Sequence, residues 1–185
     1  MPNYFGEQRF GRDGSNVARA LQMFAGEIVI RDRLVRGLHV SAARSYLFNA
    51  VVAERVLRGI WDRVIDGEVF GFAQNRSLIL PTNRRGDEAE RVAAGTLELT
   101  APLWGAGEPA SQGETAALER EVAARHPAIV AGLEAAGLRQ ERRVIRLRPT
   151  GSELSWEGDD LTLKFSLPKG AYATAVIREL VEVSP

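Results

Sequence analysis

The residues most able to do chemistry in this sequence lie together near its start. Residues 3–16 read NYFGEQRFGRDGSN, with three aromatic rings, two arginines and three glycines among amide and acidic side chains. No ordinary helix or strand needs this mixture, because its glycines and aromatics alternate without a helical period. Arginine offers a planar fork for phosphates and a face that stacks on bases. We predict that residues 1–13 form a loop, and the question is what its side chains bind.

Several classes of catalytic site are excluded by the residue types present. The chain has 185 residues and no cysteine, which excludes disulfide scaffolds, thiolate zinc sites and thiol nucleophiles. Its two histidines, His39 and His126, are far apart in sequence, so a histidine-based metal site or triad has little to draw on. There is neither a Walker phosphate loop nor a G-x-S-x-G nucleophile elbow. His39 precedes the strongest predicted helix, where a capping or surface role is expected.

Charge is unevenly distributed along a chain whose net charge is zero. All but two of its 24 basic residues are arginines, a bias that a GC-rich genome alone could also produce. Residues 1–60 carry nine arginines against five acidic residues, and residues 136–150 carry five against one. Two basic segments in a neutral chain indicate a local anionic partner. Without a membrane-spanning apolar run or a signal peptide, we expect a cytoplasmic protein with no membrane contact.

Hydrophobic periodicity predicts an α+β chain. The clearest helix is predicted to start at Ser41 as its cap and to end at Gly59, after a stretch 28–37 that reads as a linker. Its predicted apolar positions are Tyr46, Leu47, Ala50, Val51 and Leu57. The other predicted helices are 16–25, capped by Ser15 or Asn16, and 84–95, 114–125, 127–137 and 170–183; the predicted strands are 68–73, 76–82, 96–102, 142–149, 153–158 and 160–168, the first two joined by a turn at Gln74-Asn75.

The character of the chain changes near residue 140. A mixed helix and sheet lobe extends to about residue 138, and a β-β-β-α block follows. Strand 160–168 alternates, so Leu161, Leu163, Phe165 and Leu167 are expected on one side. In the last helix, Tyr172, Ala175, Val176 and Leu180 are expected to face inward.

Four blocks of the sequence resemble the TruD family of tRNA pseudouridine synthases. In the family's order they are PNYFGEQRFGRDGSN, SAARSYLFNAVVAERV, LELTAPLWGAGE and FSLPKGAYATAVIRELVE. In the second block, Ser41, Ala42, Ala43, Arg44, Phe48, Asn49, Glu54 and Arg55 are in register with the family's helix. The resemblance extends from residue 2 to residue 182 and so covers nearly the whole chain.

The resemblance implies both an activity and a division into domains. The family isomerises a uridine in tRNA, at position 13 in its bacterial members, by breaking the glycosidic bond and rejoining the turned base through carbon. It needs no metal or organic cofactor. The implied domains are a loop leading out of the catalytic core (1–13), the family's inserted domain (14–138), and the last strands and helix of the catalytic domain (139–185).

The resemblance also implies site residues. It places the opening loop in the cleft between the catalytic core and the inserted lobe, with a flipped base and phosphates as ligands. Gln8 would read a base edge, and Arg9 and Arg12 would hold phosphate or pair across the domain junction. The full set of RNA-binding or cleft-lining residues is Asn3, Tyr4, Phe5, Gln8, Arg9, Phe10, Arg12, Arg44 and Arg178.

Structural alternatives stand beside these roles. Phe5 and Phe10 could be core plugs, Arg9 a structural ion-pair partner, and Arg178 half of a buried salt bridge. The arginines at 142, 143, 146 and 148 alternate along a predicted strand, so at most half of them could face one RNA surface.

The family's catalytic aspartate is expected outside this chain. In the family it lies in a Gly-x-Lys-Asp segment upstream of the Asn-Tyr-Phe-Gly block, as does a second motif of Asn-x-Phe type. None of the chain's aspartates follows Gly-x-Lys; they are Asp13, Asp32, Asp62, Asp66, Asp87, Asp159 and Asp160. The chain therefore reads as the C-terminal part of a TruD-like enzyme, inactive alone and completed by the missing half.

Two other readings stay open. The chain could be a non-catalytic RNA-binding module that uses its basic N-terminal loop, with affinity that falls as salt rises. Alternatively, its C-terminal block could present an open edge strand and an apolar face, and so dimerise, aggregate or bind a partner strand.

Overall fold

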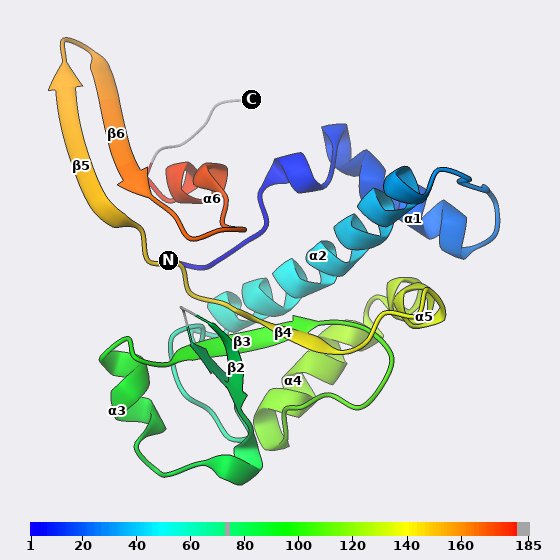
Figure 1. Cartoon of the computed structure of the whole chain (residues 1–185), viewed down its shortest axis with the longest axis horizontal. Coiled ribbons are helices and arrows are strands. Elements are labelled where there is room, and N and C mark those ends of the chain that lie inside the picture. The colour runs from blue at the N-terminus through cyan, green and yellow to red at the C-terminus, as the bar shows by residue number, and fades with distance from the viewer. Residues whose placement is uncertain (73–74, 181–185) are drawn as a thin grey trace.

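A four-stranded antiparallel sheet forms the centre of the computed structural model, which describes residues 1–72 and 75–180 (Figure 1). The strand order is β2-β1-β3-β4, and a separate two-stranded sheet pairs β5 with β6. The strands are β1 (Phe70–Phe72), β2 (Asn75–Ile79), β3 (Glu98–Leu103), β4 (Glu141–Val144), β5 (Thr150–Glu157) and β6 (Asp160–Ser166). The predicted α+β class is confirmed. Of the predicted turn at Gln74-Asn75, Gln74 lies outside the described residues.

The longest helix, α2 (Arg33–Leu57), starts eight residues before the predicted position. Its cap is Asp32, whose carboxylate accepts the backbone N–H of Leu34 at 2.8 Å and that of Val35 at 3.2 Å. The predicted cap at Ser41 is therefore wrong, and of the predicted linker at 28–37 only residues 28–32 lie outside the helix. The first turns of α2 are exposed, so their apolar side chains, Leu34, Val35 and Leu38, do not mark a buried face. The predicted stop is confirmed by Gly59, which has φ +66° just past the helix.

The structure describes five other α-helices, and Figure 1 shows α6 beside the β5–β6 hairpin, apart from the central sheet. They are α1 (Ser15–Phe24), α3 (Glu88–Ala93), α4 (Gly113–Ala124), α5 (Pro127–Ala135) and α6 (Ala173–Arg178). Helix α2 packs on β3, α1, α4 and α5, and its buried residues join those of the strands in one core. That core includes Leu47, Phe48, Val51, Phe70, Leu97, Leu99, Leu133 and Ile145. No helix in the described part of the chain could cross a membrane.

Two side chains of α2 lie where the sequence did not place them. His39 is 3% exposed inside the helix, and neither ring nitrogen has a hydrogen-bond partner among the described residues. Its predicted capping or surface role is wrong, because α2 extends past it and packs against α1. Burial lowers the pKa of His39, and the nearby Arg19 lowers it further. Leu57, expected on the buried face, is 82% exposed at the end of the helix.

Helix α1 lies against α5 at a point of very close approach. The ring of Phe24, at the end of α1, lies over Gly132 of α5, where an added Cβ would overlap it. Glycine at 132 is therefore required by packing, and this contact fixes the distance between the two helices. Neither predicted cap residue caps α1, which begins after Gly14 without a side-chain cap.

The start of the chain is tied to the segment that follows β4. Asn3 N–H donates to Ile145 O at 2.8 Å, and Leu147 N–H donates to Met1 O at 2.9 Å. The predicted loop 1–13 then contains two single helical turns, η1 (Glu7–Arg9) and η2 (Arg12–Gly14). Because β4 itself pairs with β3, residues 1–3 and 141–147 are both attached to the central sheet.

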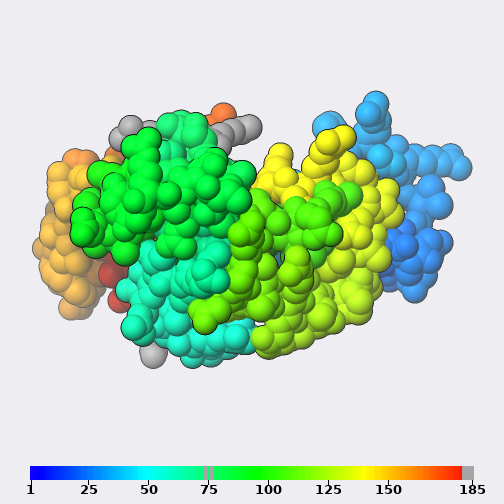
Figure 2. Space-filling model, turned by 90° about the horizontal axis from the view of Figure 1, so that it is seen from below, coloured from blue at the N-terminus to red at the C-terminus, as the bar shows by residue number. Residues whose placement is uncertain are grey.

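The β5–β6 hairpin projects from the rest of the molecule. Figure 2 shows the hairpin (orange) and the turn between α1 and α2 (blue) at opposite ends. The predicted alternation of β6 is confirmed, since Leu161, Leu163, Phe165 and Leu167 are half-buried between exposed neighbours. In α6, Ala175 and Val176 are buried as predicted, but Leu180 is exposed. Residues 181–183 of the predicted last helix lie outside the described residues, and the three-domain division stays a prediction.

Candidate functional site

The N-terminal loop is attached to α2 by the amide of Asn49. Phe5 N–H donates to Asn49 Oδ1 at 2.9 Å, and Asn49 Nδ2 donates to Phe5 O at 2.9 Å. Both backbone groups of one loop residue are therefore satisfied by a single helical side chain. This pairing fixes the height of the loop above α2 and so positions the residues on either side of Phe5.

The ring of Phe5 lies at the centre of an aromatic and cationic cluster. It meets Phe48 edge-on at a centroid distance of 5.4 Å and Tyr172 at 5.8 Å. The Arg143 guanidinium lies 4.2 Å from the Phe5 centroid, and that of Arg9 lies 5.7 Å away. Burial lowers the pKa of Arg143. Half-buried Phe5 is thus both part of the core packing and next to two cations.

Asn3 and Arg9 support this cluster from beside the ring. Buried Asn3 donates to Val144 O at 2.9 Å and accepts from Arg143 at 3.0 Å. Arg9 donates to the hydroxyl of Tyr172 at 2.9 Å and to that of Ser41 at 3.3 Å. Within the described residues Arg9 has no acidic partner, so the ion-pair alternative for it is wrong and its charge is not neutralised there.

An open groove of about 1380 Å³ runs beside this cluster. Six of the nine predicted site residues line it: Tyr4, Phe5, Gln8, Phe10, Arg12 and Arg178. The wall opposite the loop comes from α1, α2, α5 and α6. The structure therefore brings most of the predicted residues to one cavity, whereas Asn3, Arg9 and Arg44 lie outside its lining.

One end of the groove is closed by contacts between η1 and α6. Thr174 Oγ1 donates to Gln8 Oε1 at 3.0 Å, and Arg178 pairs with Glu7 at 2.8 Å. The Arg178 and Glu7 side chains are 62% and 77% exposed. The alternative of a buried salt bridge at Arg178 is therefore wrong, and an exposed pair of this kind contributes at most about 1 kcal/mol.

Arg44 has a structural set of partners. Its guanidinium donates to the backbone oxygens of Leu103 and Trp104, both at 2.9 Å, and to the carboxylate of Glu141 at 3.1 Å. These contacts hold the glycine-rich loop that follows β3 against α2. Burial lowers the pKa of Arg44, although Glu141 opposes the shift. Arg44 therefore positions this loop and does not face the groove.

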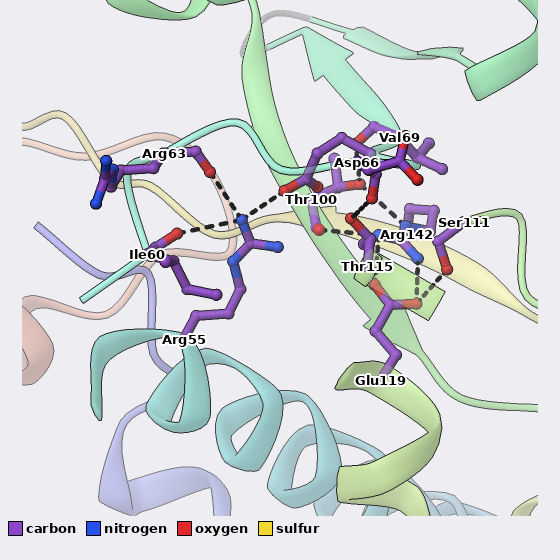
Figure 3. Close-up of polar contacts among 11 residues, drawn as sticks. Arg55, Ile60, Arg63, Asp66, Val69, Thr100, Ser111, Thr115, Glu119 and Arg142 are labelled. Atoms are coloured by element: carbon purple, nitrogen blue, oxygen red, sulfur yellow. Dashed lines mark hydrogen bonds and ion pairs between the residues drawn. The ribbon is translucent and has the colours of Figure 1, made fainter. Parts of the chain in front are cut away.

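The arginines around β4 also turn toward acids inside the lobe. Arg142 makes two hydrogen bonds to the Glu119 carboxylate, at 2.8 and 2.9 Å, and a third to Thr100 O at 2.9 Å (Figure 3). The Glu98 carboxylate pairs with Arg146 Nε at 2.6 Å and with Arg148 Nε at 3.1 Å. Three of the four arginines are thus committed to these two acids, which agrees with the expectation that at most half of them could face one RNA surface.

A second buried pair lies close to the first. Arg55 donates to Glu68 at 2.5 Å and to the backbone oxygens of Ile60 and Arg63 (Figure 3). Burial raises the pKa of Glu68, and Arg55 opposes the shift. These partners show that Arg55, which belongs to the family-like block on α2, serves to hold the segment between α2 and β1.

Three carboxylates, those of Glu7, Asp13 and Glu179, line the groove, and the sequence had not placed any there. Asp13 is exposed, has φ +54°, and makes no hydrogen bond or ion pair with the described residues. Asp159 lies at the tip of the β5–β6 hairpin, as predicted. No cluster of three potential metal ligands occurs within residues 1–72 and 75–180.

Two groove residues were missed from the sequence. Tyr46 of α2 and His126, just before α5, form a T-shaped pair with a centroid distance of 5.3 Å and an interplanar angle of 87°. Tyr46 was expected on the buried face of its helix, but it is 40% exposed. Burial lowers the pKa of His126, and Arg125 lowers it further. No local pattern joins residues 80 positions apart, so only the folded structure could bring them together.

Comparison with known proteins decides the family. The family described as tRNA pseudouridine synthase D (TruD) matches residues 14–180. The chain belongs to the TruD family. The suspected resemblance is thereby confirmed.

The relatives give the same assignment over the whole chain. The chain is 45% identical to tRNA pseudouridine synthase D of Aeromonas salmonicida over 184 residues, which cover 98% of this chain and 51% of that protein. It is also 45% identical to the protein of the same name from Xanthomonas axonopodis pv. citri, with 100% and 54% covered. The chain therefore spans about half the length of the curated relatives it matches.

A solved structure supports the fold. A crystal structure assigned to TruD from Methanosarcina mazei aligns with a TM-score of 0.67, covering 96% of this chain and 60% of that one. The sequences are 17% identical, so this likeness concerns the fold alone.

Proposed function

We propose that this chain is part of a tRNA pseudouridine synthase and supplies one wall of its RNA-binding cleft. The observation that carries the proposal is the convergence of six family-like residues on the groove described above. In this proposal the complete enzyme isomerises a uridine of tRNA to pseudouridine, at position 13 as in the bacterial members of the family. No metal or organic cofactor takes part.

The groove has the chemistry that such a ligand requires. Single-stranded RNA is held by cations along its phosphates and by aromatic faces for its bases. Arg12 lines the groove and Arg9 lies in the same loop outside the lining, and no acid among the described residues neutralises either charge. Tyr4 and Phe10 line the same groove. Gln8 offers an amide at the rim, beside its contact with Thr174.

We propose that the catalytic carboxylate comes from outside these residues. The reaction needs a carboxylate in contact with the ribose of the target nucleotide, held in fixed geometry. Asp13 is on an exposed turn and makes no ion pair with the described residues, and Glu7 is paired with Arg178. Neither environment resembles a preorganised catalytic site, in which neighbouring groups fix both the position and the charge of the carboxylate.

The missing catalytic segment would dock beside the β5–β6 hairpin. Leu154 and Trp156 of β5 are largely exposed, and the hairpin has two open edges. An exposed apolar strand surface of this kind is typical of a contact with further protein. The expected partner is the family segment that carries Gly-x-Lys-Asp, either in the same polypeptide or as a separate chain.

A tritium-release assay tests the catalytic part of the proposal. The substrate is an unmodified tRNA transcript that carries 5-tritiated uridine. The 185-residue chain alone is expected to release no tritium above a buffer control. Addition of a protein segment bearing the family's Gly-x-Lys-Asp motif is expected to start release. Turnover by the chain alone would refute the assignment of the carboxylate to another segment.

Binding of the same transcript, measured together with turnover, distinguishes part of an enzyme from a non-catalytic RNA-binding module. Both readings predict an affinity for tRNA that falls as salt rises, because phosphate contacts release counterions. Only the enzyme reading predicts turnover after addition of the catalytic segment. Binding without turnover in that mixture would favour the binding module, which the uncompensated Arg9 and Arg12 equally support.

A further inference from the structure

The edge-to-face pair of Tyr46 and His126 lies in the groove apart from the Phe5 cluster. Phe5 is enclosed by Phe48, Tyr172 and two guanidinium groups, whereas neither Tyr46 nor His126 takes part in that cluster. The pair joins α2 to the start of α5, two elements of the lobe. Two aromatic surfaces therefore line one groove at separate places.

The exposure of Tyr46 is unusual among the aromatic residues of α2 and the sheet. Phe48 and Phe70 are completely buried, while Tyr46 keeps 40% of its surface open. The other large aromatic side chain this exposed within the described residues is Trp156, on the hairpin. Because His126 meets the tyrosine ring at 87°, its edge contact orients one ring while leaving surface of the pair open to the groove.

The polar atoms of the pair are also available. Neither the Tyr46 hydroxyl nor a ring nitrogen of His126 makes a hydrogen bond to any residue in the described ranges. Burial and Arg125 lower the pKa of His126 and so favour its neutral ring, which can both donate and accept. A base edge needs donors and acceptors of this kind.

A cation lines the same groove. Arg12, in the η2 turn, is exposed, and its guanidinium makes no ion pair or hydrogen bond with the described part of the chain. Arg12 thus differs from Arg178, which is engaged by Glu7. An aromatic surface and a free guanidinium in one groove match the two parts of a nucleotide, its base and its phosphate.

We propose that Tyr46 and His126 form a stacking site for an unpaired base of the bound RNA, with Arg12 contacting a phosphate of the same strand. The proposal rests on the RNA-binding function proposed above and adds a nucleotide site separate from the Phe5 cluster. The ligand class is single-stranded RNA. An apolar protein segment seated on the tyrosine is the competing occupant, and it predicts a different response to substitution.

Fluorescence anisotropy with a 5′-fluorescein 12-nucleotide oligouridine and with an unmodified tRNA transcript tests the proposal on the complete 185-residue chain. Tyr46→Leu keeps an apolar side chain but removes the ring, and it is expected to weaken binding of the oligonucleotide about 5- to 100-fold. Tyr46→Phe keeps the ring and is expected to stay within about twofold of the parent chain. The matched control is Trp156→Leu, which removes the other exposed aromatic and is expected to leave the affinity unchanged.

The outcomes separate this proposal from the one on which it rests. If the parent chain binds neither RNA, the RNA-binding function and the stacking site are both refuted. If the parent chain binds but Tyr46→Leu binds equally well, only the stacking site is refuted, and the apolar-segment alternative gains support.

Photocrosslinking with a 5-iodouridine oligonucleotide gives an answer that does not depend on the folding of a variant. Irradiation of the complex with the parent chain, followed by peptide mass spectrometry, is expected to identify adducts on Tyr46 or His126. Adducts confined to other residues would overturn the proposal. Circular dichroism of Tyr46→Leu and Tyr46→Phe shows whether a loss of affinity reflects unfolding.

Discussion

The two arginine-rich segments of this chain resemble each other in sequence and differ in the folded protein. The arginines at 142, 146 and 148 point at Glu98 and Glu119, acids that lie more than 20 residues away in the chain. In the N-terminal loop, Arg9 contacts only hydroxyl groups and rings, and Arg12 contacts no acid among the described residues. The fold thus supplies acids to the arginines at 142, 146 and 148 and not to Arg9 and Arg12, which makes the N-terminal loop the candidate binding surface.

Breaking the Arg142–Glu119 pair should produce the largest effect. Arg142 is 3% exposed and Glu119 is 1% exposed, so Arg142→Ala leaves a carboxylate buried without its partner. Removal of one member of such a pair costs about 3–5 kcal/mol, which lowers the melting temperature of a chain this size by about 6–20 °C. Thermal unfolding followed by circular dichroism measures the change.

Arg148→Ala is the control for this pair. Arg148 is half exposed and shares Glu98 with Arg146, so its removal should change the free energy of unfolding by less than about 1 kcal/mol. Equal melting temperatures for the Arg142 and Arg148 variants would contradict the structural role assigned to the β4 segment.

The double change Arg9→Ala with Arg12→Ala should have the largest effect on RNA binding. Loss of two phosphate contacts is expected to weaken binding of the tRNA transcript about tenfold near 100 mM salt and to flatten the salt dependence of the affinity. Anisotropy measured across a salt series gives both quantities. The matched control, Arg139→Ala with Arg148→Ala, removes two exposed arginines from the other basic segment and should leave both nearly unchanged. A larger loss of affinity in the control variant would show that the basic segment 136–150, and not the N-terminal loop, contacts the RNA.

The pKa of His39 should show a smaller and more local effect, that of the nearby Arg19 charge. This pKa is lowered by burial and by Arg19, which has no acidic partner in the described ranges. A histidine whose pKa is lower in the folded than in the unfolded state contributes stability above about pH 6.5, its pKa in the unfolded state. This stability is lost as the pH falls through the pKa of the folded state. Arg19→Gln is therefore expected to raise the pKa of His39, measured by NMR titration, and to reduce the loss of stability at acid pH. An unchanged His39 titration would show that the charge of Arg19 is screened.

Asp13→Asn should have the smallest effect. The change removes a negative charge from the groove, so affinity for the tRNA transcript is expected to rise by about twofold. Asparagine tolerates the left-handed backbone found at this position, so the fold should be retained. Once the catalytic segment is added, turnover should be unaffected. Loss of that turnover would show that Asp13 takes part in catalysis and would contradict the proposal that the catalytic carboxylate comes from another segment.

Sequence reasoning predicted most elements of the fold because local patterns determine them. The alternation of β6 and the glycine after α2 were both read correctly. The start of α2 was missed because its exposed first turns lie in the arginine-rich stretch that was read as a linker, and the cap signal of Asp32 was not used.

The candidate site was predicted less completely, because several of its residues are far apart in the sequence and meet only in the folded chain. The loop residues were found because they adjoin one another, and Gln8, Phe10 and Arg12 do line the groove. Arg44 and the β4 arginines could not be sorted from the sequence, because their partners come from remote strands and loops. Tyr46 and His126 meet only through the packing of α2 against α5.

The missing side chain of Gly132 has a consequence for evolution as well as for packing. Because the ring of Phe24 occupies the place of a methyl group there, the smallest possible mutation would act as a wedge between α1 and α5. Both helices contribute walls to the groove, so the wedge would spread those walls apart. The width of the groove therefore depends on the absence of a Cβ atom at Gly132, a residue that does not itself line the groove.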